Sequence, residues 1–185
     1  VNLFDVNAEA VQKGLAMAAI NLEKGVERGK VTEEERDASF ERLIGVTTMK
    51  DACDGVELVV EAAPERMEIK LSIFADLGER LGPEVLLATN TSSLPIGEIA
   101  ASAAHPERVV GMHFFNPVHI MKLLEVVRTE ESSDESVECA MEIGRRMGKE
   151  PILVSDSPGF ASSRLGIVIG LEAMRMLEGG VASAE

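Results

Sequence analysis

The sequence contains neither tryptophan nor tyrosine, and aromatic residues make up only 3% of its 185 positions. Proteins that bind single-stranded nucleic acid stack its bases on aromatic rings, so this scarcity disfavours that class. Basic residues are also few, 18 against 32 acidic ones, and the resulting net charge of −14 opposes nonspecific binding to nucleic acid or to an anionic membrane. We therefore expect neither nucleic acid nor a membrane as a partner.

Cysteines and long apolar runs are scarce as well. The two cysteines, Cys53 and Cys139, have no spacing typical of a metal site, so we expect no metal, and their low number favours a reducing compartment. No run of 18 apolar residues occurs, and the first residues lack the pattern of a signal peptide. These absences predict a soluble, cytoplasmic protein. The first residue is Val1 rather than methionine, which indicates a truncated start.

What the sequence does contain is a regular alternation of short apolar runs with segments of helical period, and 45% of its residues are hydrophobic. Strands joined by helices in this way predict an α/β fold with a Rossmann-like, doubly wound, mostly parallel sheet. One long apolar helix follows, so we place a domain boundary between residues 1–155, the sheet domain, and residues 156–185, the first helix of an all-helical domain. The expected strands are 1–4, 45–48, 57–61, 85–88, 108–115, 123–127 and 151–154, and the expected helices are 9–28, 32–43, 65–81, a short one after Pro95, and 135–147. Thr32 and Glu35 fit a capping box at the start of the second of these helices.

Asp5 ends the first apolar run and precedes a helix. In dinucleotide-binding folds an acid after the second strand accepts hydrogen bonds from the adenosine ribose and disfavours the extra phosphate of NADP. The glycine-rich turn G-x-G-x-x-G that belongs to such a fold is absent from the sequence. Taken alone, Asp5 is also typical of a helix N-cap or a loop charge.

Two further features could carry chemistry. His113 lies near the end of one expected strand and Glu125 on the next, so the pair suits acid–base catalysis if the strands are neighbours. A buried histidine satisfied by a backbone carbonyl, with Glu125 as an unrelated surface charge, is the alternative. Residues 90–93, Asn-Thr-Ser-Ser, follow a buried strand, where polar side chains line the ligand crevice of an open sheet. They also suit a turn with a helix cap.

Together these segments resemble the L-3-hydroxyacyl-CoA dehydrogenase family, including the bacterial 3-hydroxybutyryl-CoA dehydrogenases. The matching segments stand in the family's order and spacing over nearly the whole chain: LVVEA at 58–62, NTSSL at 90–94, GMHFFNP at 111–117, MKLLEVV at 121–127 and DSPGF at 156–160.

The resemblance implies a role for each matching position. His113 would be the general base for the 3-hydroxyl proton, and Glu125 would orient it and balance its charge. Ser92 would bind the substrate oxygen beside the nicotinamide, and Asn116 would hold the nicotinamide end. The implied cofactor is NAD, with Asp5, Glu65, Lys70, Ser92 and Asn116 as its contacts. The implied substrate contacts are Asn21, Arg28, Lys70, Ser92 and Ser163.

The implied activity is the NAD-dependent interconversion of a short-chain (S)-3-hydroxyacyl-CoA and the 3-oxoacyl-CoA, by a homodimer that joins through the C-terminal domain. The glycine-rich turn and its strand are missing, and Ser163 stands where the family motif Gly-Phe-x-x-Asn-Arg has asparagine. Three alternatives remain: a crystallin-like relative without activity, a non-catalytic NAD-binding module, and one module of a larger fatty-acid oxidation protein.

Overall fold

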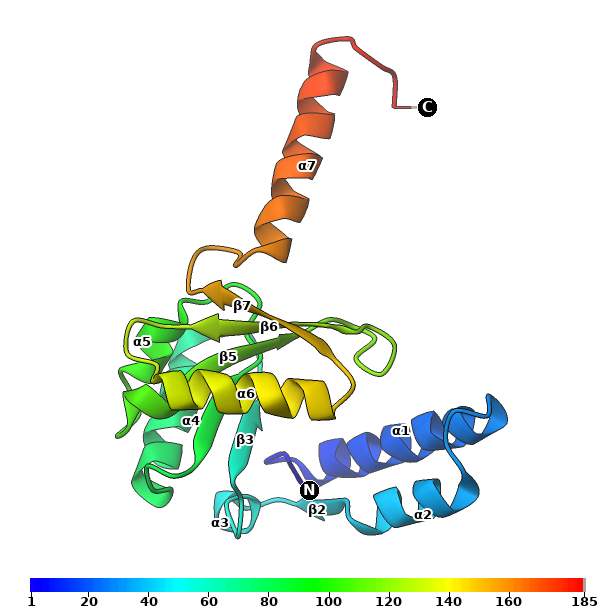
Figure 1. Ribbon diagram of the computed structural model, residues 1–185, viewed down its shortest axis with the longest axis vertical. Coiled ribbons are helices and arrows are strands. Elements are labelled where there is room, and N and C mark those ends of the chain that lie inside the picture. The colour runs from blue at the N-terminus through cyan, green and yellow to red at the C-terminus, as the bar shows by residue number, and fades with distance from the viewer. Residues whose placement is uncertain (185) are drawn as a thin grey trace. The chain divides into compact units, whose positions relative to one another are not determined.

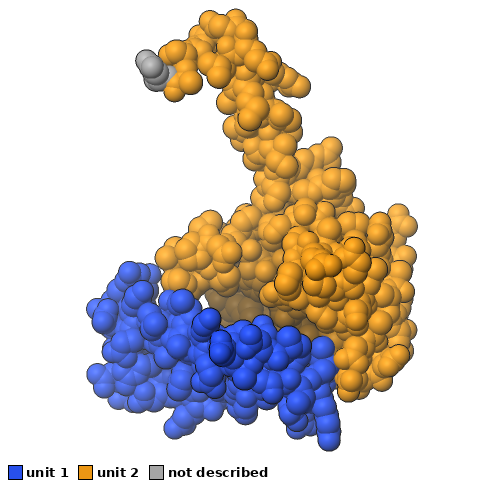
Figure 2. All heavy atoms as spheres, turned by 180° about the vertical axis from the view of Figure 1, so that it is seen from behind, with its two compact units in different colours: residues 1–56 blue, residues 57–185 orange. Residues whose placement is uncertain are grey.

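The computed structural model describes residues 1–184, and the chain divides into two compact units, residues 1–56 and 57–185 (Figure 2). Unit 1 pairs two short parallel strands and packs helices against them. Its elements are β1 (Asn2–Phe4), α1 (Ala8–Glu27), α2 (Glu33–Glu41), β2 (Ile44–Val46) and α3 (Met49–Ala52). The expected capping box opens α2: Glu35 N–H donates to Thr32 Oγ1, and Thr32 N–H donates to Glu35 Oε2.

Unit 2 contains a five-stranded sheet in the order β3-β4-β5-β6-β7, in which only the β5–β6 pair is antiparallel (Figure 1). Its strands are β3 (Leu58–Glu61), β4 (Leu86–Thr89), β5 (Val109–Phe114), β6 (Leu123–Arg128) and β7 (Glu150–Ser155). Its helices are α4 (Met67–Arg80), α5 (Ile96–Ala100), the 3-10 turn η1 (Pro106–Arg108), α6 (Asp134–Arg146) and α7 (Ser162–Glu178). The α/β class and the mostly parallel sheet are confirmed.

One core cluster of unit 2 lies between the sheet and α6. Alternate residues of the three central strands face this helix, because side chains of a strand point to opposite sides in turn. The buried cluster consists of Leu86, Ala88, Val110, Met112, Leu124, Val126, Val137 and Ala140. On the other face, a Cβ at Gly111 would collide with Ile96 of α5, so this glycine lets α5 approach the sheet closely. Helices therefore cover both faces, as expected for a doubly wound fold.

Two features differ from the sequence-based expectation. The strands form two separate sheets, because β1 and β2 hydrogen-bond to each other and not to the five-stranded sheet. The short helix α3 was not expected, since its four residues are too few to show a period. None of the helices in the described part of the chain is both long and apolar enough to cross a membrane.

Candidate active site

The antiparallel pairing of β5 and β6 places His113 directly opposite Glu125. The two side chains are in contact, with 2.8 Å between His113 Nδ1 and Glu125 Oε2. Both are buried: His113 is 5% exposed and Glu125 is 0% exposed. The imidazole also packs against two phenylalanine rings, with centroids 4.5 Å away at Phe115 and 5.7 Å away at Phe160. The pair therefore sits in apolar surroundings, where the interaction between charges is stronger than in water.

The Glu125 carboxylate receives three more hydrogen bonds, all from the start of α7. The backbone N–H groups of Ala161 and Ser162 donate to Oε1 over 3.1 and 2.8 Å. The Ser162 hydroxyl donates to Oε2 over 3.0 Å. Burial raises the pKa of Glu125, but the hydrogen bonds from His113, Ser162 and Ala161 outweigh it and hold the pKa below its usual value of 4.5. Glu125 is consequently ionised at neutral pH.

An ionised Glu125 fixes the tautomer of His113. A carboxylate can only accept hydrogen bonds, so His113 Nδ1 must carry the hydrogen between the two groups. In the neutral ring the other nitrogen, Nε2, then holds the free electron pair. This is the state that a general base requires.

A left-handed turn brings the first N–H groups of α7 onto Glu125. Gly159 has a φ of 73°, and Phe160 has a φ of 47°, a conformation that costs a residue with a side chain about 1–3 kcal/mol. The Phe160 ring is 3% exposed and packs against His113, which anchors the turn in spite of this cost. Successive N–H groups in such a turn form a concavity that binds anions, and here the anion is the carboxylate of Glu125.

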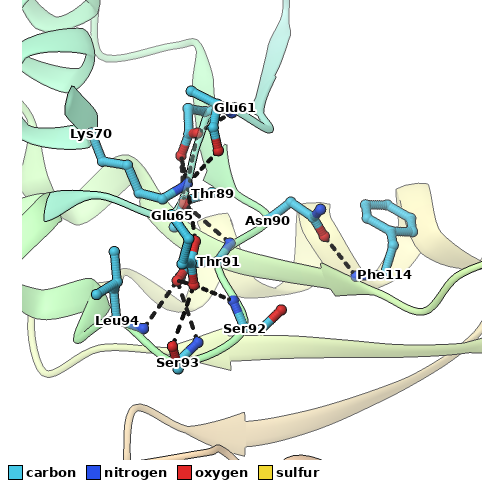
Figure 3. Close-up of polar contacts among 11 residues, drawn as sticks. Glu61, Glu65, Lys70, Thr89, Asn90, Thr91, Ser92, Ser93, Leu94 and Phe114 are labelled. Carbon is cyan, nitrogen blue, oxygen red and sulfur yellow. Dashed lines mark hydrogen bonds and ion pairs between the residues drawn. The ribbon is translucent and has the colours of Figure 1, made fainter.

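A second polar cluster surrounds Glu65, in the loop between β3 and α4 (Figure 3). Its Oε1 accepts hydrogen bonds from Thr91 Oγ1 at 2.6 Å, from the Ser92 backbone at 3.0 Å and from Ser93 Oγ at 3.4 Å. Burial raises the pKa of Glu65, but the hydrogen bonds from Thr91 and Ser92 and the charge of Lys70 outweigh it and hold the pKa below its usual value. The carboxylate therefore holds the polar turn after β4 in one shape.

Lys70 lies beside this cluster and is almost completely buried, at 1% exposure. Its ammonium group donates to Glu61 Oε1 at 2.8 Å, to Glu61 Oε2 at 3.0 Å and to the Ala63 carbonyl at 3.3 Å (Figure 3). Thr89 also donates to Glu61 Oε2, at 2.7 Å. The ammonium group of Lys70 also forms a 3.5 Å ion pair with Glu65 Oε2. Removing either partner of a buried ion pair such as Lys70–Glu61 costs roughly 3–5 kcal/mol.

Comparison with known proteins identifies the group to which this site belongs. The family described as "3-hydroxyacyl-CoA dehydrogenase, NAD binding domain" matches residues 1–157. The chain belongs to the 3-hydroxyacyl-CoA dehydrogenase family. The matching part is the family's NAD-binding domain, so its cofactor is NAD.

Two curated members of the 3-hydroxyacyl-CoA dehydrogenase family align with the whole of this chain. The 3-hydroxyadipyl-CoA dehydrogenase of Escherichia coli (strain K12) is 43% identical over 185 residues, and the probable 3-hydroxybutyryl-CoA dehydrogenase of Bacillus subtilis (strain 168) is 40% identical over 185 residues. The chain spans 39% and 64% of their lengths, respectively. The crystal structure of 3-hydroxybutyryl-CoA dehydrogenase from Escherichia coli K12 matches with a TM-score of 0.94 and 43% identity, covering 99% of this chain and 39% of that one.

The other positions that the resemblance to the dehydrogenase family implies are placed as follows in unit 2. The Ser92 side chain is exposed, and Figure 3 shows its hydroxyl directed away from Glu65. Asn116 is exposed in the loop between β5 and β6. Ser163 is half-buried in the first turn of α7, but the contact with Glu125 is made by its neighbour Ser162.

Three implied positions belong to unit 1. Asp5 follows β1, and its Oδ1 accepts a hydrogen bond from Asn7 N at 2.8 Å, while Asn7 itself is the N-cap of α1. Asn21 lies half-buried on α1, and Arg28 is the exposed C-cap residue of the same helix. The parts that these residues play in binding NAD or coenzyme A stay predictions.

The sequence analysis missed several residues of these clusters. Ser162 contacts Glu125 from 37 positions further along the chain, and Phe160 packs against His113; the left-handed turn brings both residues to the pair. Glu61 is the partner of Lys70. The sequence does hold a signal for this ion pair, because Glu61 is a charged residue at the end of an apolar strand and stands nine positions before a lysine on the next helix. Asn90 was already among the polar residues 90–93 marked in the sequence, and what the structure adds is that its Oδ1 accepts a hydrogen bond from Phe114 N at 2.9 Å, which ties the turn after β4 to the end of β5.

Proposed function

We propose that the full-length protein is an NAD-dependent dehydrogenase that interconverts a short-chain (S)-3-hydroxyacyl-CoA and the corresponding 3-oxoacyl-CoA. The observation that carries this proposal is the buried His113–Glu125 pair, in which an ionised carboxylate fixes Nδ1 as the protonated nitrogen. A domain that only bound NAD would gain nothing from such an oriented proton acceptor.

In the direction of oxidation, Nε2 of His113 takes the proton of the substrate's 3-hydroxyl group. The ring then becomes positively charged, and the carboxylate of Glu125, 2.8 Å from Nδ1, stabilises that charge. When bound, NAD supplies the hydride acceptor. In the reverse direction the protonated ring returns its proton to the 3-oxo oxygen.

The residues near the carboxyl ends of β3 and β4 suit the cofactor. Glu65 is half-exposed, with 41% of its side chain accessible, and among the described residues the contact of its Oε2 is the 3.5 Å ion pair with Lys70. An ionised carboxylate of this kind can accept hydrogen bonds from ribose hydroxyls. Ser92 and Asn116 offer exposed hydroxyl and amide groups for the nicotinamide end and the substrate oxygen. Asp5 would accept hydrogen bonds from the adenosine ribose and so favour NAD over NADP.

The proposed acyl-CoA substrate rests on the family and on a few cationic and polar positions. Asn21 and Arg28 would contact the coenzyme A arm, and the exposed guanidinium of Arg28 suits an anionic ligand. Ser163 replaces the motif asparagine, and its hydroxyl can still donate to the substrate, although it is shorter and lacks the amide carbonyl. One relative is named for a hydroxyadipyl substrate and the other for a hydroxybutyryl one, so kcat/KM has to be compared between substrates with different acyl chains.

Helix α7 supports the proposed homodimer. Its residues are exposed from position 164 to its end, although many of them are large and apolar. A helix that is apolar on every side is normally buried. We propose that α7 is covered by the all-helical domain through which two copies join. Sedimentation of the full-length protein should give a dimer at micromolar concentration, and a monomer there would contradict this part of the proposal.

Turnover of acetoacetyl-CoA and NADH by the full-length protein tests the activity directly, with His113→Gln as the decisive variant. We expect NAD binding, measured by calorimetry, to stay nearly intact, because His113 does not lie among the residues proposed for the adenosine. Loss of a general base typically costs about 10²- to 10⁴-fold in rate. A variant that retained more than about a tenth of the wild-type rate at its optimal pH would refute the assignment of His113.

A further inference from the structure

Ser162 occupies the second variable position, x, of the motif Gly-Phe-x-x-Asn-Arg. Its hydroxyl makes a contact that the proposed mechanism does not use. Ser162 Oγ donates to Glu125 Oε2 over 3.0 Å, and Oε2 is the oxygen that also receives the N–H of His113. Two donors thus share one carboxylate oxygen at the centre of the candidate active site. The Ser162 backbone N–H meanwhile binds Oε1 over 2.8 Å, so the residue holds both oxygens.

We propose that Ser162 is a positioning residue for His113, and that its hydroxyl both orients the Glu125 carboxylate and moderates the charge that the carboxylate presents to the imidazole. The inference rests on the proposed function for its effect on turnover. A hydrogen bond to a carboxylate oxygen withdraws negative charge from it, and a weaker negative charge stabilises the protonated imidazole less. Ser162 therefore keeps His113 in its basic form to lower pH than Glu125 alone would.

No other charged group competes for this role among the described residues that contact Glu125. From β5 it meets His113, the titratable partner itself. On β7 the residue paired with Glu125 is Ile152, which cannot ionise. From α7 it meets Ala161 and Ser162, and neither side chain carries a charge. A substitution at Ser162 consequently affects the protonation of His113 through the carboxylate of Glu125.

The test compares variants of Ser162 in the full-length protein. Ser162→Ala and Ser162→Val remove the hydroxyl and keep the backbone N–H, whereas Ser162→Thr retains the hydroxyl. We expect the ascending limb of the pH profile of kcat/KM in the oxidation direction to move to higher pH, by about half a unit, in the two variants without a hydroxyl. Ser162→Thr should restore the wild-type limb. Ser102→Ala is the matched control, because this half-buried serine donates only to the Ile99 carbonyl of α5.

A readout independent of turnover separates this inference from the proposed function. The ring signals of His113 can be followed by NMR titration of the full-length protein labelled with [¹³C]histidine, with His113→Gln for assignment. A midpoint that rises in Ser162→Ala and returns in Ser162→Thr supports the inference even if acyl-CoA turnover fails. A midpoint that is unchanged, falls, or is not restored by threonine overturns it, whether or not the enzyme is active.

Discussion

Replacing Glu125 by glutamine keeps the size of a completely buried side chain and removes its charge. The backbone N–H groups of Ala161 and Ser162 both donate to Oε1, so the carbonyl oxygen of the glutamine must take that place. Its NH₂ group then takes the place of Oε2 and donates to His113 Nδ1. The ring hydrogen moves to Nε2, and this tautomer cannot accept the substrate's proton.

The size of the effect on the rate follows from two losses, that of the negative charge beside His113 and that of the tautomer with a free electron pair on Nε2. When an amide replaces the carboxylate behind a catalytic histidine and enforces the wrong tautomer, the rate falls by about 10⁴-fold in the serine protease case, and loss of a general base costs about 10²- to 10⁴-fold. We expect Glu125→Gln to lower kcat in the oxidation direction by about 10³-fold. The ascending limb of the residual activity should move to lower pH, because the charge that stabilises the protonated imidazole is gone.

The assay is the initial rate of 3-hydroxybutyryl-CoA oxidation by NAD across the pH range, with NAD affinity measured separately by calorimetry. Glu142→Gln serves as the control, because Glu142 is an exposed carboxylate on α6 whose charged partner is Arg145 in the next turn. The reasoning would be refuted by a Glu125→Gln variant within tenfold of wild type. It would equally fail if the ascending limb stayed in place or moved to higher pH, since Glu125 would then not be coupled in charge to His113.

Three further outcomes are expected. Asp5→Ala should reduce the preference for NAD over NADP; a wild type that prefers NADP, or a ratio that the substitution leaves unchanged, would contradict the ribose role of Asp5. Gly159→Ala should lower kcat and thermal stability together, because a Cβ is strained at φ 73° and would press on the Arg164 backbone N 3.0 Å away; wild-type values for both would contradict this account of the turn. Because the pKa of Glu125 is lowered in the folded state, its carboxylate stabilises the fold above about pH 4.5 and loses this contribution as pH falls through the lower folded-state value. The free energy of unfolding in urea should therefore change less between pH 6 and pH 4 in Glu125→Gln than in wild type. An equal change in both proteins would contradict this account.

Local sequence patterns were sufficient to predict most of the fold. The apolar run that became β4 has no exposed residue, as a central parallel strand requires, and Thr32 with Glu35 predicted the start of α2 through a capping box that both hydrogen bonds confirm. The sequence analysis made the His113–Glu125 pair depend on neighbouring strands, and the structure meets this condition, because a short connection between two strands favours an antiparallel pair. What these residues do with a substrate stays a prediction that the experiments above test.

The sequence could not predict interactions that depend on a single backbone conformation. Two consecutive left-handed residues, Gly159 and Phe160, aim the N–H groups of α7 at Glu125, and a left-handed phenylalanine is uncommon enough that no pattern indicates it. The sequence analysis did not predict that Lys70 is buried and contacts Glu61, Ala63 and Glu65, partners that a buried ammonium group needs within the protein itself. Its expected contact with NAD or substrate stays a prediction.

The position of the His113–Glu125 pair bears on the boundary that we placed after residue 155. Three of the four hydrogen bonds to the Glu125 carboxylate come from Ala161 and Ser162, at the start of the helix assigned to the second domain. A chain that ended at residue 155 would lose these three hydrogen bonds, each of which lowers the pKa of Glu125, and would leave His113 as the only described hydrogen-bond partner of the carboxylate. The sheet thus supplies the proposed base and its carboxylate, and the segment that follows the sheet supplies three of the four hydrogen bonds that lower the pKa of this carboxylate. Any movement of α7 relative to β6 would therefore change the proton affinity of His113 through Glu125, without a new contact to the imidazole.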